Sequence, residues 1–230
     1  MSKPLCLLLF LACAAPAAAQ HAVPVHREPG HRLVFDSVRF RVLDVRFARG
    51  DTSLYHIHDA PMFYVAVATS AIAFQRVGES WSDTRPDADP GWQQGDVDMD
   101  TAYATQAVRH RIANIGAGPF HLIGITNARA GAARANARLD KELPGTAELQ
   151  SSWFRQTRVR LQPGKHTDWL KSPLPVVIVQ PFALPVELTF EASAQMLRSA
   201  GSWAVVPANT RYRLQNAGKA PANVVAIQIQ

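Results

Sequence analysis

Cysteine is nearly absent from this chain. The sequence contains two, Cys6 and Cys13, and both lie within the first nineteen residues. If that segment is removed, the remaining chain has no thiol, which excludes disulfides and a cysteine nucleophile. Stability must then come from burial of a core, which a chain of this length can supply in one large domain or two smaller ones.

Long apolar runs are also missing beyond the N-terminus. No stretch after residue 19 reaches the roughly 18 apolar residues of a membrane-spanning helix, so no membrane span is predicted. The N-terminus itself has a charged start at Lys3, a short apolar run through Leu11 and small residues ending at Ala19. This pattern predicts a signal peptide over 1–19 and a periplasmic or secreted protein. The alternatives are a buried N-terminal helix, or a lipoprotein modified at Cys13.

Charge of one sign is not concentrated anywhere in the sequence. The 24 Lys and Arg residues and 18 Asp and Glu residues give a net charge of +6, and the two kinds are interspersed. No basic segment with interleaved aromatic residues is present, so nucleic-acid binding is not expected. A weak attraction for anionic ligands remains compatible with this balance.

Apolar and polar residues alternate through much of the chain. The alternation over 32–48, the apolar segment 62–74 and the alternation over 157–161 are typical of β-strands. Residues 78–100 are rich in Gly, Pro and Asp and are interpreted as a loop. From Ala128 to Leu143 the composition favours a helix instead.

A sequence repeat indicates two modules of the same kind. The stretch from Arg109 to Pro119 returns as Arg211 to Pro221, with Arg, Arg, Asn, Gly and Pro in register. An internal repeat of this kind indicates two copies of one β-module. One position changes chemistry, because His110 becomes Tyr212, and this places any site in the first module. We expect an N-terminal module over 20–127, a helical linker over 128–150 and a C-terminal module over 151–230.

Three histidines are the candidate metal ligands. His56 and His58 are two residues apart, so on a strand their side chains point to the same side. His110, on a later strand, completes a set of three imidazoles, which are common ligands of Fe, Mn, Ni and Zn. Three protein ligands leave positions open for water or substrate. The alternative is that the three are polar residues at a barrel mouth that hold no ion.

These residues resemble the motifs of the cupin superfamily. Its first motif is G-x5-H-x-H-x3,4-E-x6-G, which Gly50, His56 and His58 match, and its second is G-x5-P-x-G-x2-H-x3-N, which His110 and Asn114 match. In the C-terminal copy, Pro207, Tyr212 and Asn216 fall on the second motif. The resemblance covers nearly all of the chain after the signal segment. It implies an all-β protein of two tandem jelly-roll barrels, a bicupin.

The chain departs from these motifs at functional positions. The glutamate of the first motif would fall at Met62 or Phe63, so that ligand is absent. In the second module, Leu170 and Ser172 take the places of the first two histidines and Tyr212 that of the third. The second barrel is therefore expected to bind no metal. A three-histidine site without the carboxylate resembles that of the thiol dioxygenases and some other oxygenases of this superfamily. An exported protein is not expected to act on an intracellular thiol.

Other side chains could contact a ligand, although each has a plainer structural interpretation. Those that strand packing or loop anchoring would explain are His121, Tyr55, Tyr64, Trp81 and Trp92. His166 is interpreted as a surface histidine. The three N-terminal histidines are interpreted as part of a solvated tail; they are His21, His26 and His31.

Three functions are compatible with the sequence. The first is an exported metalloenzyme, oxygenase-like, that holds one divalent ion with His56, His58 and His110 and acts on a small molecule. The second is a module that binds a sugar, an organic acid or a phenolic compound without turnover. The third is a structural bicupin whose barrels associate with each other or in a homodimer. The sequence offers no obvious carboxylate near the triad to serve as a general base, which weakens the first.

Overall fold

The computed structural model describes residues 21–82, 91–129, 143 and 147–230. The predicted signal peptide (1–19) and most of the predicted joining helix lie outside these residues. The described chain is almost wholly β, and its helical segments are two single 3-10 turns, η1 (Val25–Arg27) and η2 (Ala102–Ala104). The all-β prediction is confirmed. No helix among the described residues has the length and apolar character needed to cross a bilayer.

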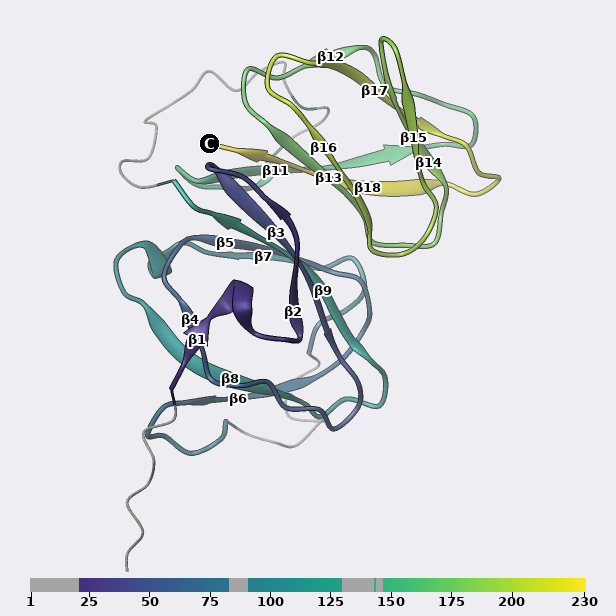
Figure 1. Ribbon diagram of the computed structural model, residues 1–230. Helices are drawn as coiled ribbons and strands as arrows, with labels where there is room; N and C mark the ends of the chain where they lie inside the picture. The colour runs from purple at the N-terminus through teal and green to yellow at the C-terminus, as the bar shows by residue number, and fades with distance from the viewer. Residues whose placement is uncertain (1–20, 83–90, 130–142, 144–146) are drawn as a thin grey trace, which may run out of the picture.

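The described strands form two barrels, each made of a four-stranded and a five-stranded sheet (Figure 1). The strands of the first barrel are β1 (Val23–Pro24), β2 (His31–Asp36), β3 (Phe40–Phe47), β4 (His56–His58), β5 (Met62–Ala66), β6 (Ile72–Arg76), β7 (Val97–Asp100), β8 (Val108–Asn114) and β9 (Phe120–Asn127). Those of the second barrel are β10 (Ala147–Gln150), β11 (Phe154–Leu161), β12 (Leu170–Lys171), β13 (Val176–Gln180), β14 (Val186–Phe190), β15 (Ala194–Leu197), β16 (Ser202–Val206), β17 (Arg211–Asn216) and β18 (Ala222–Ile229).

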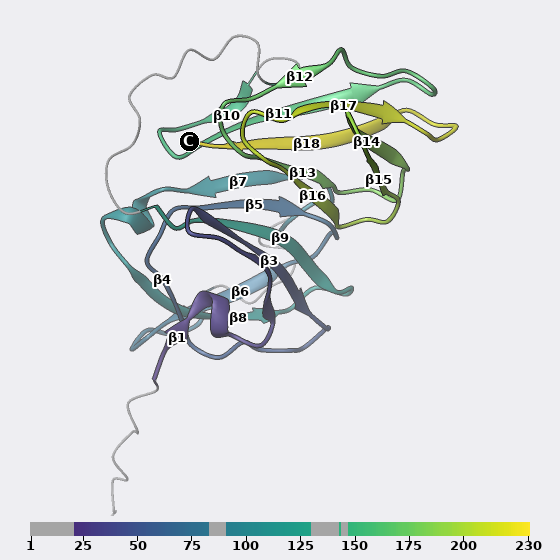
Figure 2. The same ribbon diagram turned by 45° about the horizontal axis from the view of Figure 1, so that its top comes forward.

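The sheets stack as four layers, which Figure 2 shows in succession. In the first barrel, the sheet β1-β4-β8-β6 faces the sheet β2-β3-β9-β5-β7. In the second, β10-β11-β18-β13-β16 faces β12-β17-β14-β15. The two five-stranded sheets are the middle layers and pack against each other. The described strand pairs are antiparallel with one exception, the parallel pair β1 and β4, which brings the N-terminal segment to the four-stranded sheet of the first barrel.

The central strands of the middle sheets are covered on both faces, and β13 is accordingly apolar and buried from Val176 to Val179. In β13, Val176 and Ile178 face the interior of the second barrel, while Val177 and Val179 face the first barrel. In β3, Leu43 faces the first barrel's interior. Sequence alternation over 32–48 predicted half-buried strands, and for β3 this was wrong because the second barrel covers its outer face.

The sequence repeat has a structural cause in two asparagines at the ends of equivalent strands. The Asn114 side-chain amide donates to the carbonyl oxygens of Phe47 and Gly118, at 3.1 and 2.9 Å. The Asn216 amide donates in the same way to Leu161 and Ala220, at 2.9 and 2.8 Å. Each asparagine also accepts a hydrogen bond from the backbone N–H two residues later. Each one therefore holds the turn after its strand to the neighbouring sheet.

Two segments differ from the sequence-based assignment. Residues 147–150, the end of the predicted helical linker, form β10, which pairs with β11. Residues 97–100, assigned to a loop, form β7, which pairs with β5 at the edge of the middle sheet. Strands of four residues beside Pro- and Gly-rich segments are too short to produce a readable alternation.

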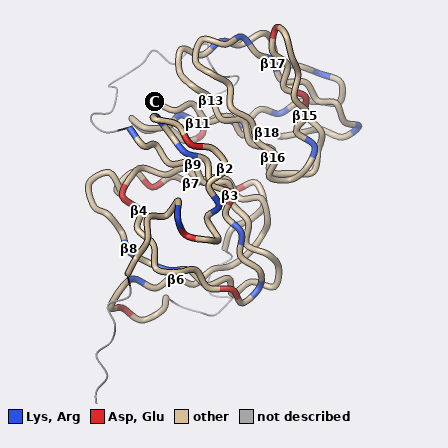
Figure 3. Tube along the Cα trace, in the orientation of Figure 1, with Lys and Arg blue, Asp and Glu red and all other residues tan. Residues whose placement is uncertain are grey.

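Over the described chain, basic and acidic residues are scattered across both barrels, as the sequence suggested (Figure 3).

Candidate metal centre

Neighbouring strands β4 and β8 bring the three predicted histidines together. His56 and His58 lie on the same face of β4, and His56 is directly opposite His110 on β8. One ring nitrogen from each lies within 4.8 Å of the other two. The ring centroids are separated by 4.7 Å for His56 and His110, 4.9 Å for His58 and His110, and 5.0 Å for His56 and His58.

Burial keeps these imidazoles neutral. Burial, followed by the nearby rings of His31 and His110, lowers the pKa of His56 to about 2. Burial, and then His31 and Arg76, lowers the pKa of His110 to about 4. The pKa of His58 is lowered well below its usual value, again chiefly by burial. A neutral imidazole keeps the lone pair that a metal ion requires, so three such rings together can bind a cation.

The outer ring nitrogens have partners that orient the rings. His56 Nδ1 lies 2.9 Å from the backbone oxygen of Leu54, so its N–H donates there. That hydrogen bond leaves Nε2 of His56 as the coordinating atom, and this atom is buried without a hydrogen-bond partner among the described residues. His58 Nδ1 lies 2.8 Å from Sδ of Met62, one of the two residues at which the missing glutamate would fall. An orphaned, buried nitrogen beside two further imidazoles fits a metal ion.

Sequence reasoning placed His31 in a solvated tail, and this was wrong. His31 is only 5% exposed, and its ring centroid is 4.5 Å from that of His56. Its Nδ1 lies 2.7 Å from Oε2 of Glu28, which is also buried. The parallel pairing of β1 with β4 carries this segment to the triad. The sequence signal was a histidine directly before an alternating segment, which marks the start of a strand.

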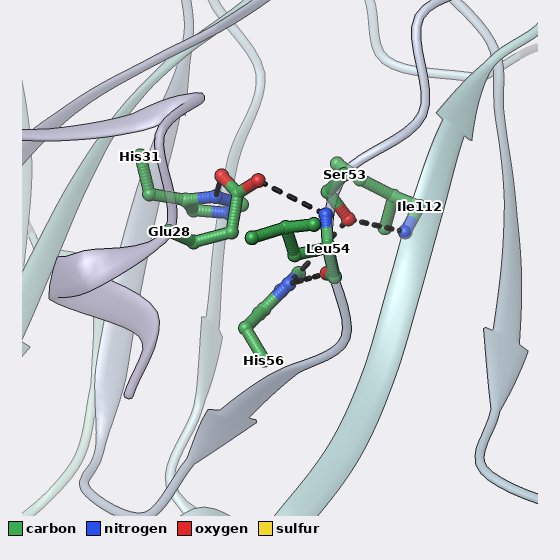
Figure 4. Close-up of polar contacts among 6 residues, drawn as sticks. All are labelled: Glu28, His31, Ser53, Leu54, His56 and Ile112. Atoms are coloured by element: carbon green, nitrogen blue, oxygen red, sulfur yellow. Dashed lines mark hydrogen bonds and ion pairs between the residues drawn. The ribbon is translucent and has the colours of Figure 1, made fainter. Parts of the chain in front are cut away.

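Glu28 links His31 to the loop that carries His56 (Figure 4). Its Oε1 accepts a hydrogen bond from the backbone N–H of Leu54, and the Leu54 carbonyl in turn accepts from His56. Burial alone raises the pKa of Glu28, but the hydrogen bond and charge of His31 and the Leu54 N–H outweigh burial and lower it. One carboxylate thus orients two of the four histidines at the site.

A cavity of about 190 Å³ opens beside the triad. Its wall is largely apolar and aromatic, and the larger side chains in it are Tyr64, Ile72, Trp92, Tyr103, Phe120 and Leu122. The ring of Tyr103 lies 4.9 Å from that of His58, between centroids. Two carboxylates, Asp98 and Asp100 on β7, also line this cavity. The sequence did not indicate these acidic groups near the triad, because they lie on β7, whose residues were assigned to a loop.

Solved structures with the same arrangement of strands were found. AerE from Microcystis aeruginosa matches over 88% of this chain and 98% of its own, with a TM-score of 0.59 and 11% identity. A cupin 2 conserved barrel domain protein from Leptotrichia buccalis matches over 86% of this chain and 87% of its own, with a TM-score of 0.53 and 11% identity. The chain adopts the cupin fold. A salicylate 1,2-dioxygenase from Pseudaminobacter salicylatoxidans matches over 84% of this chain and 71% of its own, with a TM-score of 0.57 and 10% identity. No family model and no curated protein matches the sequence.

The second cupin barrel has no histidine at the three positions where the first has its triad. Leu170 pairs with Tyr212 in the register that His56 and His110 occupy in the first barrel. Tyr212 is fully buried and belongs to the apolar core of that barrel, against which Leu170 packs. Ser172 is buried and donates to the backbone oxygen of Leu174. Among the described residues, the one cluster of three metal-ligating side chains is that of the first barrel.

The remaining candidates of the cupin barrels have structural partners. His121 lies 2.8 Å from the Asp44 carboxylate, as a satisfied sheet histidine would. His166 is exposed. Arg111 lies over the rings of Tyr55 and Trp81, at 4.8 and 4.9 Å from their centroids. Trp92 and Tyr64, by contrast, line the cavity.

Proposed function

We propose that this protein is an exported metalloenzyme whose first cupin barrel holds one divalent ion, Fe, Mn, Ni or Zn, with His56, His58 and His110. The observation that carries the proposal is the orphaned, buried Nε2 of His56 within a cluster of three neutral imidazoles. Its substrate is a small molecule bound in the adjoining cavity, and the reaction is oxygenase-like. The fold shared with a salicylate dioxygenase is compatible with this reaction class.

The residues around the site have separable tasks. A divalent ion there supplies positive charge that polarises a substrate oxygen and, for iron or manganese, electrons for dioxygen chemistry. The Leu54 carbonyl fixes the ring of His56 so that Nε2 faces inward. Glu28 holds His31 against His56. The apolar wall, including Phe120 and Leu122, excludes water from the reacting groups.

Metal analysis of untagged protein tests the metal site. We expect close to one ion per chain. The variant His56→Ala/His58→Ala/His110→Ala is expected to retain none, and Tyr212→Phe, at the equivalent place in the second barrel, to retain the full amount. Stoichiometric metal in the triple variant would reject the site.

Oxygen uptake separates an oxygenase from a module that only binds. The metal-loaded protein is expected to consume dioxygen when a substrate is found among small phenols, acids and sugars, and the triple variant is expected not to. A ligand that binds with micromolar affinity to the loaded protein without any oxygen uptake would favour the non-catalytic function.

Export is a separate part of the proposal and has its own test. The charged, apolar and small-residue segments of residues 1–19 and the lack of cysteine beyond Cys13 support it. Intact mass of the protein recovered from a secreting bacterial host is expected to correspond to a chain that begins at Gln20. A cytoplasmic protein that retains Met1 through Ala19 would contradict export.

A further inference from the structure

The two carboxylates of β7 give the cavity a charge that the triad does not explain. Asp98 and Asp100 share one face of the strand and line the cavity, while Val97 and Met99 on the other face pack in the core between the barrels. Asp98 pairs across the ladder with Tyr64, and Asp100 with Met62, so both stand beside residues of the site.

No lysine or arginine among the described residues of the cavity wall balances these carboxylates. His31, which also lines the cavity, is paired with the carboxylate of Glu28 instead. The hydrogen bonds recorded for the two carboxylates come from neutral groups: the Met99 N–H to Asp98 at 2.8 Å, and the Ala102 N–H to Asp100 at 2.9 Å. Two carboxylates thus lie together at the β7 end of the cavity, with no lysine or arginine of the described lining beside them. This end of the cavity is therefore negative.

The side chain of Tyr103 lies between the two carboxylates of β7 and the triad. Its ring centroid lies 4.9 Å from that of His58, and burial, followed by the nearby Asp100 carboxylate, raises the pKa of its hydroxyl to about 12. The two ends of the cavity are thus about one phenol side chain apart. The volume of about 190 Å³ agrees with this span, since an apolar cavity of roughly 150 Å³ holds one benzene ring.

We propose that the site takes a single-ring phenol that carries a positively charged amine on a short chain. The ring lies against Tyr64, Trp92 and Tyr103, and the ammonium group meets Asp98 and Asp100 at the mouth. The phenolic oxygen faces the triad, and this part rests on the proposed metal site. A carboxylated ring such as salicylate is disfavoured, because it would bring a third negative charge against the two aspartates.

Three phenols of nearly equal size test the charge preference: tyramine, 4-propylphenol and 3-(4-hydroxyphenyl)propionate. They differ at the end of the chain, which is cationic, neutral or anionic. In calorimetric titrations of the metal-loaded protein at low salt, tyramine is expected to bind at least about tenfold more tightly than the propionate. The preference is expected to shrink as salt is added.

Two variants test whether the preference for the cationic phenol depends on the carboxylates of β7. Asp98→Asn/Asp100→Asn is expected to abolish it, and the asparagine oxygen at position 100 can still accept from the Ala102 N–H, which protects the fold. Asp168→Asn, an exposed position in the second barrel, is expected to leave it unchanged. Equal binding of the three phenols, tighter binding of the propionate, or a preference that survives the double variant would overturn the inference.

The outcome is separable from that of the proposed function. If the loaded protein holds its metal at the triad but prefers the anion, the inference fails and the metal site stands. If no metal binds at the triad, the proposed function fails, and the same titrations on metal-free protein still decide the charge preference. In that case, tyramine binding that is lost in Asp98→Asn/Asp100→Asn and kept in Asp168→Asn would support the inference that the two carboxylates bind the ammonium group.

Discussion

Glu28 illustrates how one buried acid can organise a site without touching the reacting centre. Its two oxygens hold different parts of the chain, the ring of His31 and the backbone N–H of Leu54. Outer partners of metal-binding histidines fix the tautomer and the orientation of the ring. The carboxylate reaches His56 through the Leu54 carbonyl, so its influence extends over two histidines.

Glu28→Gln is expected to weaken metal binding by roughly 10- to 100-fold. A glutamine can still accept from the Leu54 N–H with its oxygen, but it then presents an N–H group to Nδ1 of His31 in place of an acceptor, so the hydrogen bond that holds this ring is lost. Competition with a chelator measures the change. Glu148→Gln, at an exposed carboxylate of the second barrel, is the control. Equal affinities in the two variants would contradict the role of Glu28.

At the scale of the element, the two barrels repeat one way of holding a strand end. Asn114 and Asn216 make equivalent hydrogen bonds, although only the first lies on a strand with a site histidine. The repeat in the sequence therefore records the architecture of the barrel, and the chemistry depends on residues that differ between the copies.

Asn114→Ala and Asn216→Ala are each expected to lower the free energy of unfolding by about 2–4 kcal/mol, because each leaves one buried and one part-buried carbonyl oxygen without its donor. Denaturant titration measures the loss. Asn223→Ala, on a partly exposed position of β18, is expected to change stability by less than about 1 kcal/mol. A large loss at only one of the two buried positions would show that the barrels do not depend on this contact equally.

The sequence predicted the elements whose signals are local. The spacing of His56 and His58 and the repeat that aligns His110 with Tyr212 predicted that the three histidines lie together and that the second barrel lacks them, and the structure shows this clustering and this difference. His31 was missed because its burial depends on contacts that are distant in sequence, with the rings of His56 and His58. Asp98 and Asp100 were missed because their strand follows a loop-like composition. Both failures come from long-range pairing that no short pattern encodes.

At the scale of the whole molecule, the two barrels share one apolar layer. Phe154 is fully buried in it, and its ring centroid lies 5.7 Å from that of Phe63 in the other barrel. An interface this apolar resembles the interior of a single domain. The barrels are therefore expected to unfold together.

Phe154→Ala is expected to lower the free energy of unfolding by about 3–5 kcal/mol, because it opens a cavity between the barrels. Denaturation followed by tryptophan fluorescence and by circular dichroism should give one coincident transition before and after the change. Two separated transitions in the parent protein would show that the barrels unfold independently.

Acid is expected to destabilise the metal-free protein through the triad. The folded-state pKa values of His56, about 2, and His110, about 4, lie below the value near 6.5 of an unfolded histidine, and that of His58 is also lowered. Below pH 6.5 the unfolded chain binds protons that the folded chain does not. The free energy of unfolding therefore decreases as the pH is lowered. Well below pH 6.5 it decreases by about 1.4 kcal/mol per pH unit for each such histidine.

Denaturant titrations at pH 7, 6 and 5 measure this slope. The parent protein is expected to lose stability more steeply than His56→Ala/His58→Ala/His110→Ala, which lacks the three groups. Parallel curves for the two proteins would show that the triad is not the source of the acid sensitivity.

The order of the barrels along the chain has a consequence during synthesis. Every described strand of the first barrel precedes residue 128, so its histidines can assemble while the second barrel is still being made. At that moment the outer faces of β3, β5 and β9, with side chains such as Phe63 and Ile125, have no cover. A nascent or truncated chain that ends near this point would expose this apolar sheet face to chaperones or to other copies of itself. The second barrel thus covers the apolar outer face of the first barrel once it has been synthesised.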